Sequence, residues 1–205
     1  KGANIIFEDA AIDQAVEGIV NAIFFNQGHV CCAGSRLFVQ ETIYEEVLNK
    51  LKDRISNLIV GDPLDKNTDI GAINSIDQLQ IINNYIKIGK KEGAEIFQSE
   101  CKIPKKGNWC PPTLFLNVSQ SHTIVQEEIF GPVLTIQTFR TINEVIEKAN
   151  NTPFGLASGV WTEKGSKIFR LANELNSGVV WANTYNKFDA SSPFGGFKES
   201  GIGRE

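Results

Sequence analysis

Two adjacent cysteines, Cys31 and Cys32, lie in the stretch FFNQGHVCCAGSRLF at residues 24–38. A cysteine becomes a nucleophile when its thiolate is stabilised, for example by backbone N–H groups in a turn, and its sulfur is accessible. The stretch suits this chemistry at Cys31, because Gly28 allows the backbone to turn and the small residues 33–35 leave room for a substrate. The same residue types also fit a pair of small, buried, apolar side chains, and composition alone does not decide between the two.

The four cysteines do not form a pattern typical of a metal site or of a secreted disulfide scaffold. No Cys-x-x-Cys pair occurs, and His29 and His122 are the only histidines. We therefore expect no metal, and a reducing, cytoplasmic location.

Composition limits the partners of the chain. Its 205 residues, 41% of them hydrophobic, suffice for one domain with a substantial core, and the formal charge of -4 comes from interspersed acids and bases. We expect no nucleic-acid partner, because no basic face is evident. No stretch reaches the roughly 20 apolar residues that a membrane span needs, so we expect no membrane partner either.

Periodic apolar residues predict the elements that position the cysteines. Residues 12–23 carry apolar side chains at three- and four-residue spacing, which predicts a helix capped by Asp9 and ending near Gly28. Further helices are predicted from Thr42, Ser75 and Thr141 and over residues 163–175; strands are predicted at NIIF, 37–40, AEIFQ, TLFLNV, VLTIQTF, LASGVW and GVVWANT. This alternation predicts an α/β fold: an open, mostly parallel sheet with helices on both faces.

Four stretches of the chain carry a family resemblance. They are Phe24-x-x-x-Gly28-x-x-Cys31 followed by CAGSR, EEIFGPVL from Glu127, NTPFGLASGVWT from Asn151, and GVVWANTYNKFDASSPFGGFKESGIGRE to the end. In this order and spacing they resemble the NAD(P)-dependent aldehyde dehydrogenase superfamily over essentially the whole chain. The VCCAGSR form resembles the family sixteen branch.

The resemblance implies roles for individual residues. Cys31, rather than Cys32, matches the nucleophile that attacks the aldehyde carbon, forming a thiohemiacetal and then a thioester. Glu128 matches the residue that holds the nicotinamide ribose hydroxyls, and Phe130 the ring beside the nicotinamide. The implied reaction oxidises an aldehyde to a carboxylic acid with NAD or NADP.

The C-terminal stretch supplies further implied positions. Phe188 and Phe194 match positions that line the substrate tunnel, although ordinary core packing is the alternative for both. Asn183 matches a polar position that we expect to be structural. The glycines of SPFGGFKESGIG lack a Gly-Lys-Ser/Thr sequence, so we expect close backbone packing there rather than a phosphate loop.

The sequence also departs from the family pattern. His29 stands where the family usually has Gln or Glu, and because an unperturbed imidazole is largely neutral at pH 7, we expect little effect of His29 on thiol reactivity. Residues 1–4 resemble those that directly follow the family's Glu-Leu-Gly-Gly run. We therefore expect residues 1–205 to be the catalytic domain alone. The activating glutamate, the dinucleotide-binding domain and the C-terminal strand that joins subunits of a homo-oligomer would then lie outside it.

Two other functions stay open from the sequence. A non-catalytic interaction or scaffold protein could be built on this domain, although retention of Cys31 argues against it. An acyl carrier or esterase without redox chemistry would need only the cysteine and oxyanion donors.

Overall fold

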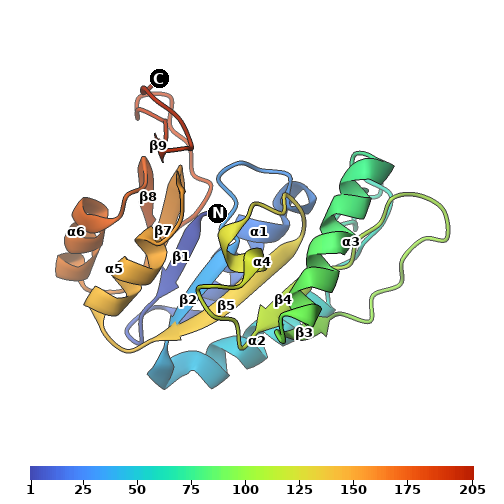
Figure 1. Ribbon diagram of the computed structural model, residues 1–205, viewed down its shortest axis with the longest axis horizontal. Helices are drawn as coiled ribbons and strands as arrows, with labels where there is room; N and C mark the ends of the chain where they lie inside the picture. Colours follow the sequence, from blue (N-terminus) through green and yellow to red (C-terminus); the bar gives the residue numbers. More distant parts are fainter.

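The computed structural model describes all of residues 1–205, which fold around one large sheet (Figure 1). Its strands are β1 (Ala3–Ile6), β2 (Arg36–Gln40), β3 (Glu95–Gln98), β4 (Thr113–Leu116), β5 (Val133–Phe139), β7 (Ala157–Trp161) and β8 (Val179–Ala182). The order across this seven-stranded sheet is β3-β4-β5-β2-β1-β7-β8. Every neighbouring pair is parallel except β3 with β4 at one edge, which confirms the predicted mostly parallel sheet.

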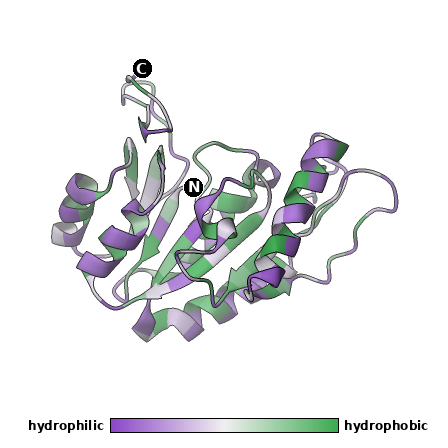
Figure 2. Cartoon of the chain, in the orientation of Figure 1, coloured by the Kyte–Doolittle hydropathy of each residue, from purple (hydrophilic) through white to green (hydrophobic).

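Helices connect the parallel strands and cover both faces of the sheet, as predicted. They are α1 (Ile12–Phe24), α2 (Tyr44–Ser56), α3 (Ile76–Lys91), α4 (Thr123–Gln126), α5 (Ile142–Asn150) and α6 (Gly165–Glu174). Helices α1 and α2 share one apolar cluster with the strands, while α5 and α6 share another. Figure 2 shows hydrophobic residues along the central strands and many hydrophilic residues on α5 and α6.

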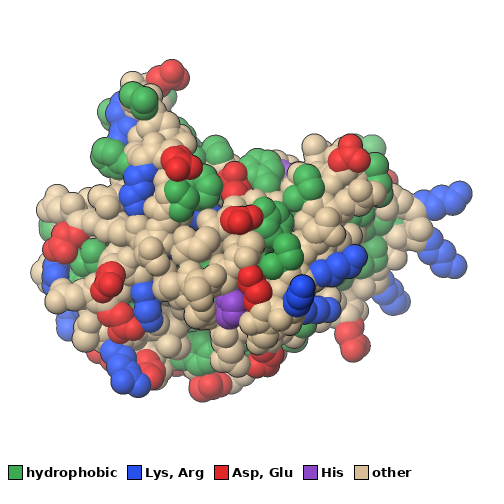
Figure 3. Space-filling view, viewed as in Figure 1, with side chains coloured by type: hydrophobic (Ala, Val, Ile, Leu, Met, Phe, Trp, Pro, Cys, Tyr) green, Lys and Arg blue, Asp and Glu red, His purple; other side chains and the backbone are tan.

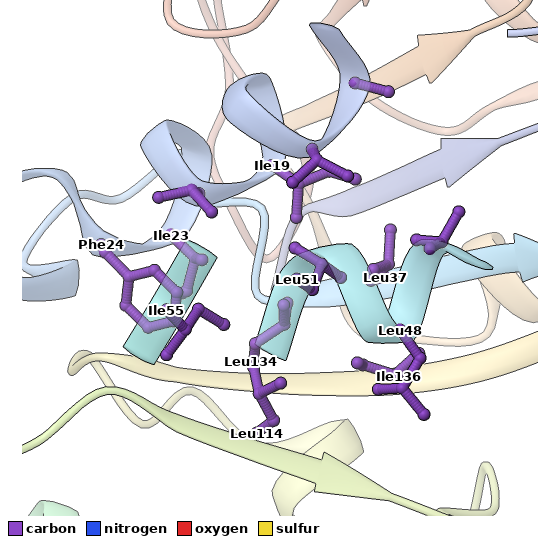
Figure 4. Packing of buried hydrophobic residues seen from close by; sticks show 14 of the residues in the cluster. Ile19, Ile23, Phe24, Leu37, Leu48, Leu51, Ile55, Leu114, Leu134 and Ile136 are labelled. Atoms are coloured by element: carbon purple, nitrogen blue, oxygen red, sulfur yellow. The ribbon is translucent and has the colours of Figure 1, made fainter. Parts of the chain in front are cut away.

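Alternation along each strand explains how one sheet supports two cores. In β1, Ile6 faces the cluster that includes α1 and α2, whereas its neighbour Ile5 belongs to the cluster of α5 and α6. Figure 4 shows side chains of α1 and α2 meeting Leu37 of β2 and Leu134 of β5. Burying each such side chain contributes roughly 1.5–3 kcal/mol, so this packing fixes α1 and the turn that follows it.

The helix starts were predicted with mixed success. Ser75 caps α3 by accepting a hydrogen bond from the N–H of Gln78, and Thr141 caps α5 in the same way, which confirms both predictions. The prediction for Asp9 was wrong. Its carboxylate instead accepts hydrogen bonds from Thr162 and Lys167, and α1 begins at Ile12 without a side-chain cap.

Other boundaries differ from the sequence prediction by a few residues. Helix α1 ends at Phe24, and a short 3-10 turn over Phe25–Gly28 completes the segment predicted as helix. A 3-10 turn over Glu41–Ile43 likewise precedes α2, so Thr42 does not cap a helix, and its hydroxyl donates to Glu8 instead. The short antiparallel pair of β6 (Phe154–Gly155) and β9 (Phe197–Lys198) was not predicted.

The surface carries charges of both signs. Figure 3 shows acidic and basic side chains distributed over the visible face rather than one continuous basic surface. None of the helices combines the length and apolar character that a bilayer crossing requires.

Candidate active site

The cysteine turn begins where α1 ends. Asn26 and Gln27 have φ values of 49° and 48°, and Gly28 follows at 78°, so the chain reverses sharply out of the helix. A hydrogen bond of 3.0 Å from the N–H of Ala33 to the carbonyl of Val30 then closes a turn. The two cysteines occupy the centre of this turn.

Gly28 is required because of its contact with a second segment. A Cβ at this position would clash with the carbonyl of Gly131, and its positive φ is itself unfavourable for other residues. Gly131 lies just before β5, so the close approach holds the cysteine turn against the start of that strand.

The two cysteines differ in environment. The Cys31 side chain is exposed, whereas Cys32 is 1% exposed and packs against Trp181 and Tyr185. Burial, and then the neighbouring Cys31 thiol, raise the pKa of Cys32 to about 11. Of the two thiols, only that of Cys31 is therefore accessible to a substrate.

The segment containing Glu128 and Phe130 is held by α3. The side-chain amide of Gln78 donates to the carbonyls of both Ile129 and Phe130 at 3.1 Å, and the Tyr85 hydroxyl donates to Glu127 at 2.9 Å. Ile129 is buried, while Glu128 and Phe130 on either side of it are exposed. The hydrogen bonds to α3 therefore hold the backbone from which the Glu128 carboxylate and the Phe130 ring project.

These two segments meet in one hollow. It is small, with a cavity volume of about 20 Å³, and is lined by Cys31, Glu128 and Phe130, together with Lys1 and Val30 among others. The hollow lies at the amino ends of β1, β2 and β5, because the lining residues directly precede these strands. Open α/β sheets more often bind ligands at the carboxyl ends, so strand direction would not have located this site.

Lys1 is a lining residue that sequence reasoning missed. Its amine is buried and donates to the carbonyl of Ile124 at 2.9 Å. Burial, and then the charge of Arg36, lower the pKa of the Lys1 side chain to about 7. The family resemblance of residues 1–4 was the only signal at this position, and it did not indicate that the Lys1 side chain is buried.

Phe188 and Phe194 lie in a separate aromatic cluster. The ring of Phe188 is 5.4 Å from those of both Trp181 and Phe194, in edge-to-face arrangements, and Phe188 is 61% exposed. The cluster lines a hollow beside β8 that does not include Cys31. It adjoins the cysteine turn through Tyr185, whose hydroxyl donates to the carbonyl of Cys32 at 2.8 Å.

Comparison with known proteins identifies the family of the chain. The model of the aldehyde dehydrogenase family matches residues 1–205. The chain belongs to the aldehyde dehydrogenase family. The assignment to the family sixteen branch remains a prediction.

Individual aldehyde dehydrogenases are similar over the whole chain. A mitochondrial aldehyde dehydrogenase of Sus scrofa is 47% identical over all 205 residues, and one of Alternaria alternata is 45% identical. A solved structure of an aldehyde dehydrogenase from Bacillus cereus in complex with NAD+ is 44% identical, with a TM-score of 0.96 over the entire chain. The chain spans 39% and 41% of the two curated relatives and 42% of the Bacillus cereus structure.

Two further predictions from the aldehyde dehydrogenase resemblance concern structural residues. Asn183 forms two hydrogen bonds of 3.0 Å with the backbone of Thr162, one to its N–H and one to its carbonyl, as expected for a structural role. Near the C-terminus, a Cβ at Gly178 would clash with the backbone of Gly195, in line with the predicted close packing of the glycine-rich stretch.

Proposed function

We propose that the polypeptide carrying this chain oxidises an aldehyde to a carboxylic acid with NAD or NADP, through a covalent intermediate on Cys31. The observation that supports this most is the shared hollow. An accessible thiol from the cysteine turn lies there with the carboxylate and ring of Glu128 and Phe130, which come from about 100 residues further along the chain.

The first step assigned to this chain is nucleophilic addition. The Cys31 thiolate forms a C–S bond to the aldehyde carbon, and the carbonyl oxygen gains the negative charge of the thiohemiacetal. The N–H of Cys31 donates to no other backbone or side-chain group of the chain, so it is free to stabilise that oxygen.

The remaining steps convert this adduct into product. When bound beside Glu128 and Phe130, NAD or NADP would supply the acceptor for the hydride of the former aldehyde carbon. The resulting thioester on Cys31 is then hydrolysed by water, which releases the carboxylic acid and restores the thiol. We assign activation of that water, and the dinucleotide-binding domain, to parts of the polypeptide outside residues 1–205.

Glu128 and Phe130 fit the nicotinamide half of such a cofactor. A carboxylate can accept hydrogen bonds from two ribose hydroxyls, and an exposed ring offers a flat surface to the nicotinamide. Both side chains are exposed, and Gln78 of α3 holds the carbonyls of Phe130 and of Ile129, the residue between them.

The aromatic cluster supports an apolar aldehyde as substrate. Phe188 and Phe194 would line the approach to the cysteine turn, where rings favour an aliphatic or aromatic tail. Replacing Phe188 by Ala is expected to raise the KM for apolar aldehydes several-fold and to leave that for acetaldehyde nearly unchanged. Steady-state rates across an aldehyde series test this assignment.

The proposal also includes the cellular location and the oligomeric state of the enzyme. Four free thiols are consistent with a reducing, cytoplasmic location. Assembly into a homo-oligomer, through a C-terminal strand outside this chain, follows from the family resemblance alone.

The direct test is NADH or NADPH formation by the complete polypeptide with short, long and aromatic aldehydes. Formation of reduced cofactor that depends on aldehyde supports the proposal. A folded protein that reduces neither cofactor with any of them would favour a scaffold role, and ester hydrolysis without cofactor would favour an esterase.

A further inference from the structure

His29 connects the cysteine turn to the segment that carries Phe130. Its ring atom Nδ1 lies 2.8 Å from the carbonyl oxygen of Phe130, across 101 residues of sequence. The two rings are also stacked, with centroids 5.5 Å apart and an interplanar angle of 14°. One side chain thus contacts both the backbone and the ring of Phe130.

The contacts of His29 define the role of each ring nitrogen. The N–H of Asn74 points at Nε2 from 3.5 Å, so Nε2 is the acceptor in a weak hydrogen bond. Nδ1 then carries a proton and donates it in the 2.8 Å hydrogen bond to the Phe130 carbonyl. Both nitrogens are therefore engaged, and neither is available to accept the thiol proton of the nearby Cys31.

Phe130 needs such support because of its backbone. It has a φ of 54°, a left-handed conformation that is costly for a residue with a large side chain. Residues persist in that region only where their surroundings determine them strongly. The Phe130 carbonyl receives two donors, Gln78 from α3 and His29 from the cysteine turn, and the His29 ring also packs on the phenyl ring.

We propose that His29 is a positioning residue for the nicotinamide half of the cofactor, acting through Phe130 and not on the Cys31 thiol. The proposal rests on the function proposed above. It explains how a histidine two residues before the nucleophile can matter without acid–base chemistry. By tying the Phe130 backbone and ring to the cysteine turn, His29 fixes the distance between the thiol and the surface that receives the nicotinamide.

Three variants of the complete polypeptide separate the two contacts. His29→Ala removes both, His29→Phe keeps a ring without the hydrogen bond, and His29→Gln keeps a donor without the ring. The readouts are the Kd for NAD+ by fluorescence, the alkylation rate of Cys31 by iodoacetamide, and hydrogen–deuterium exchange of residues 127–131 without cofactor.

His29→Ala is expected to raise the Kd for NAD+ about five- to twentyfold, the range for losing a hydrogen bond and a packed ring. His29→Phe and His29→Gln should each restore part of that loss. Cys31 alkylation should stay within about threefold in all three, because both ring nitrogens of His29 are engaged by groups other than the thiol. Exchange of residues 127–131 should rise in His29→Ala.

The outcomes distinguish this inference from the proposed function. A wild-type protein that binds neither NAD+ nor NADP+ overturns both. If the wild type binds the cofactor but His29→Ala leaves both the Kd for NAD+ and the hydrogen–deuterium exchange of residues 127–131 unchanged, the positioning role alone is overturned. A large fall in Cys31 alkylation at unchanged Kd would instead show that His29 acts on the thiol.

A double variant that combines His29→Ala with Phe130→Ala tests this directly through its Kd for NAD+. If His29 acts through Phe130, the double variant should bind NAD+ more tightly than the product of the two single effects predicts. Independent, multiplicative effects would contradict the inference.

Discussion

Cys31 and Cys32 are neighbours in the chain with opposite surroundings: the Cys31 thiol is exposed at the hollow, and the Cys32 thiol is enclosed beneath Trp181 and Tyr185. The turn between Val30 and Ala33 directs the two side chains apart. A sequence of two identical residues thus becomes one candidate nucleophile and one core residue.

Selective alkylation follows from this difference. At pH 8, iodoacetamide should modify Cys31 and leave Cys32 and Cys110 intact, because both are 1% exposed and burial raises the pKa of each thiol. Peptide mass spectrometry after limited labelling identifies the modified site. Cys31→Ser is the control and should abolish rapid labelling. Rapid modification of Cys32 in the folded protein would contradict the structure.

Gly28→Ala should lower the free energy of unfolding by about 2–4 kcal/mol, because the new Cβ meets the Gly131 carbonyl in a left-handed backbone conformation. Urea denaturation of the complete polypeptide measures the change. Gly165→Ala is the matched control. Gly165 opens α6 with free space around it, so alanine there should be neutral or stabilise the protein by up to about 1 kcal/mol. Equal effects of the two substitutions would contradict the proposed contact.

Arg36→Lys should be strongly destabilising although it keeps the charge. The guanidinium of Arg36 is buried and donates to the carbonyls of Lys1, Lys148 and Ala149 at 2.8–3.2 Å, which joins the start of β2 to the residues before β1 and to the end of α5. A lysine amine cannot reproduce this fork, so we expect a loss of about 2–4 kcal/mol in urea denaturation.

The control for Arg36 is Arg140→Lys. Arg140 pairs with Glu41 at 2.7 Å, but both side chains are largely exposed, so the change should stay below about 0.5 kcal/mol. A similarly small effect of Arg36→Lys would show that the buried hydrogen bonds contribute little.

Stability should fall with rising pH above about pH 9. Burial raises the pKa of Cys110 from the ordinary 9.0 to about 12, so the unfolded chain loses this proton at a lower pH than the folded one. The unfolded state then binds fewer protons between pH 9 and 12, and the free energy of unfolding falls by up to about 1.4 kcal/mol per pH unit for this group. Cys110→Ala should reduce the slope of urea-derived stability between pH 9 and 10.5. An unchanged slope would contradict the burial of this thiol.

Local patterns predicted much of the fold. The apolar spacing of α1 and the caps Ser75 and Thr141 depend on nearby residues, and all appear in the structure. Asp9 was misassigned because the partners of its carboxylate, Thr162 and Lys167, lie more than 150 residues away, where no local pattern indicates them.

The site was predictable only in part. The motif around Cys31 and the resemblance at Glu128 identified candidate residues, but not that they share one hollow. The contact between His29 and Phe130 and the left-handed backbone of Phe130 depend on long-range packing, which has no period or motif in the sequence. The burial of the Lys1 side chain beside the hollow also depends on long-range packing and was not predicted.

Aldehyde-dependent NAD+ reduction by the complete polypeptide, with wild type, Cys31→Ala and Cys32→Ala assayed side by side, is the sharpest test of Cys31 as the nucleophile. Cys31→Ala should abolish the reaction, whereas Cys32→Ala, a small change at a buried side chain, should keep most of it. Full activity of Cys31→Ala, or loss confined to a folded Cys32→Ala, would contradict the assignment of Cys31 as the nucleophile.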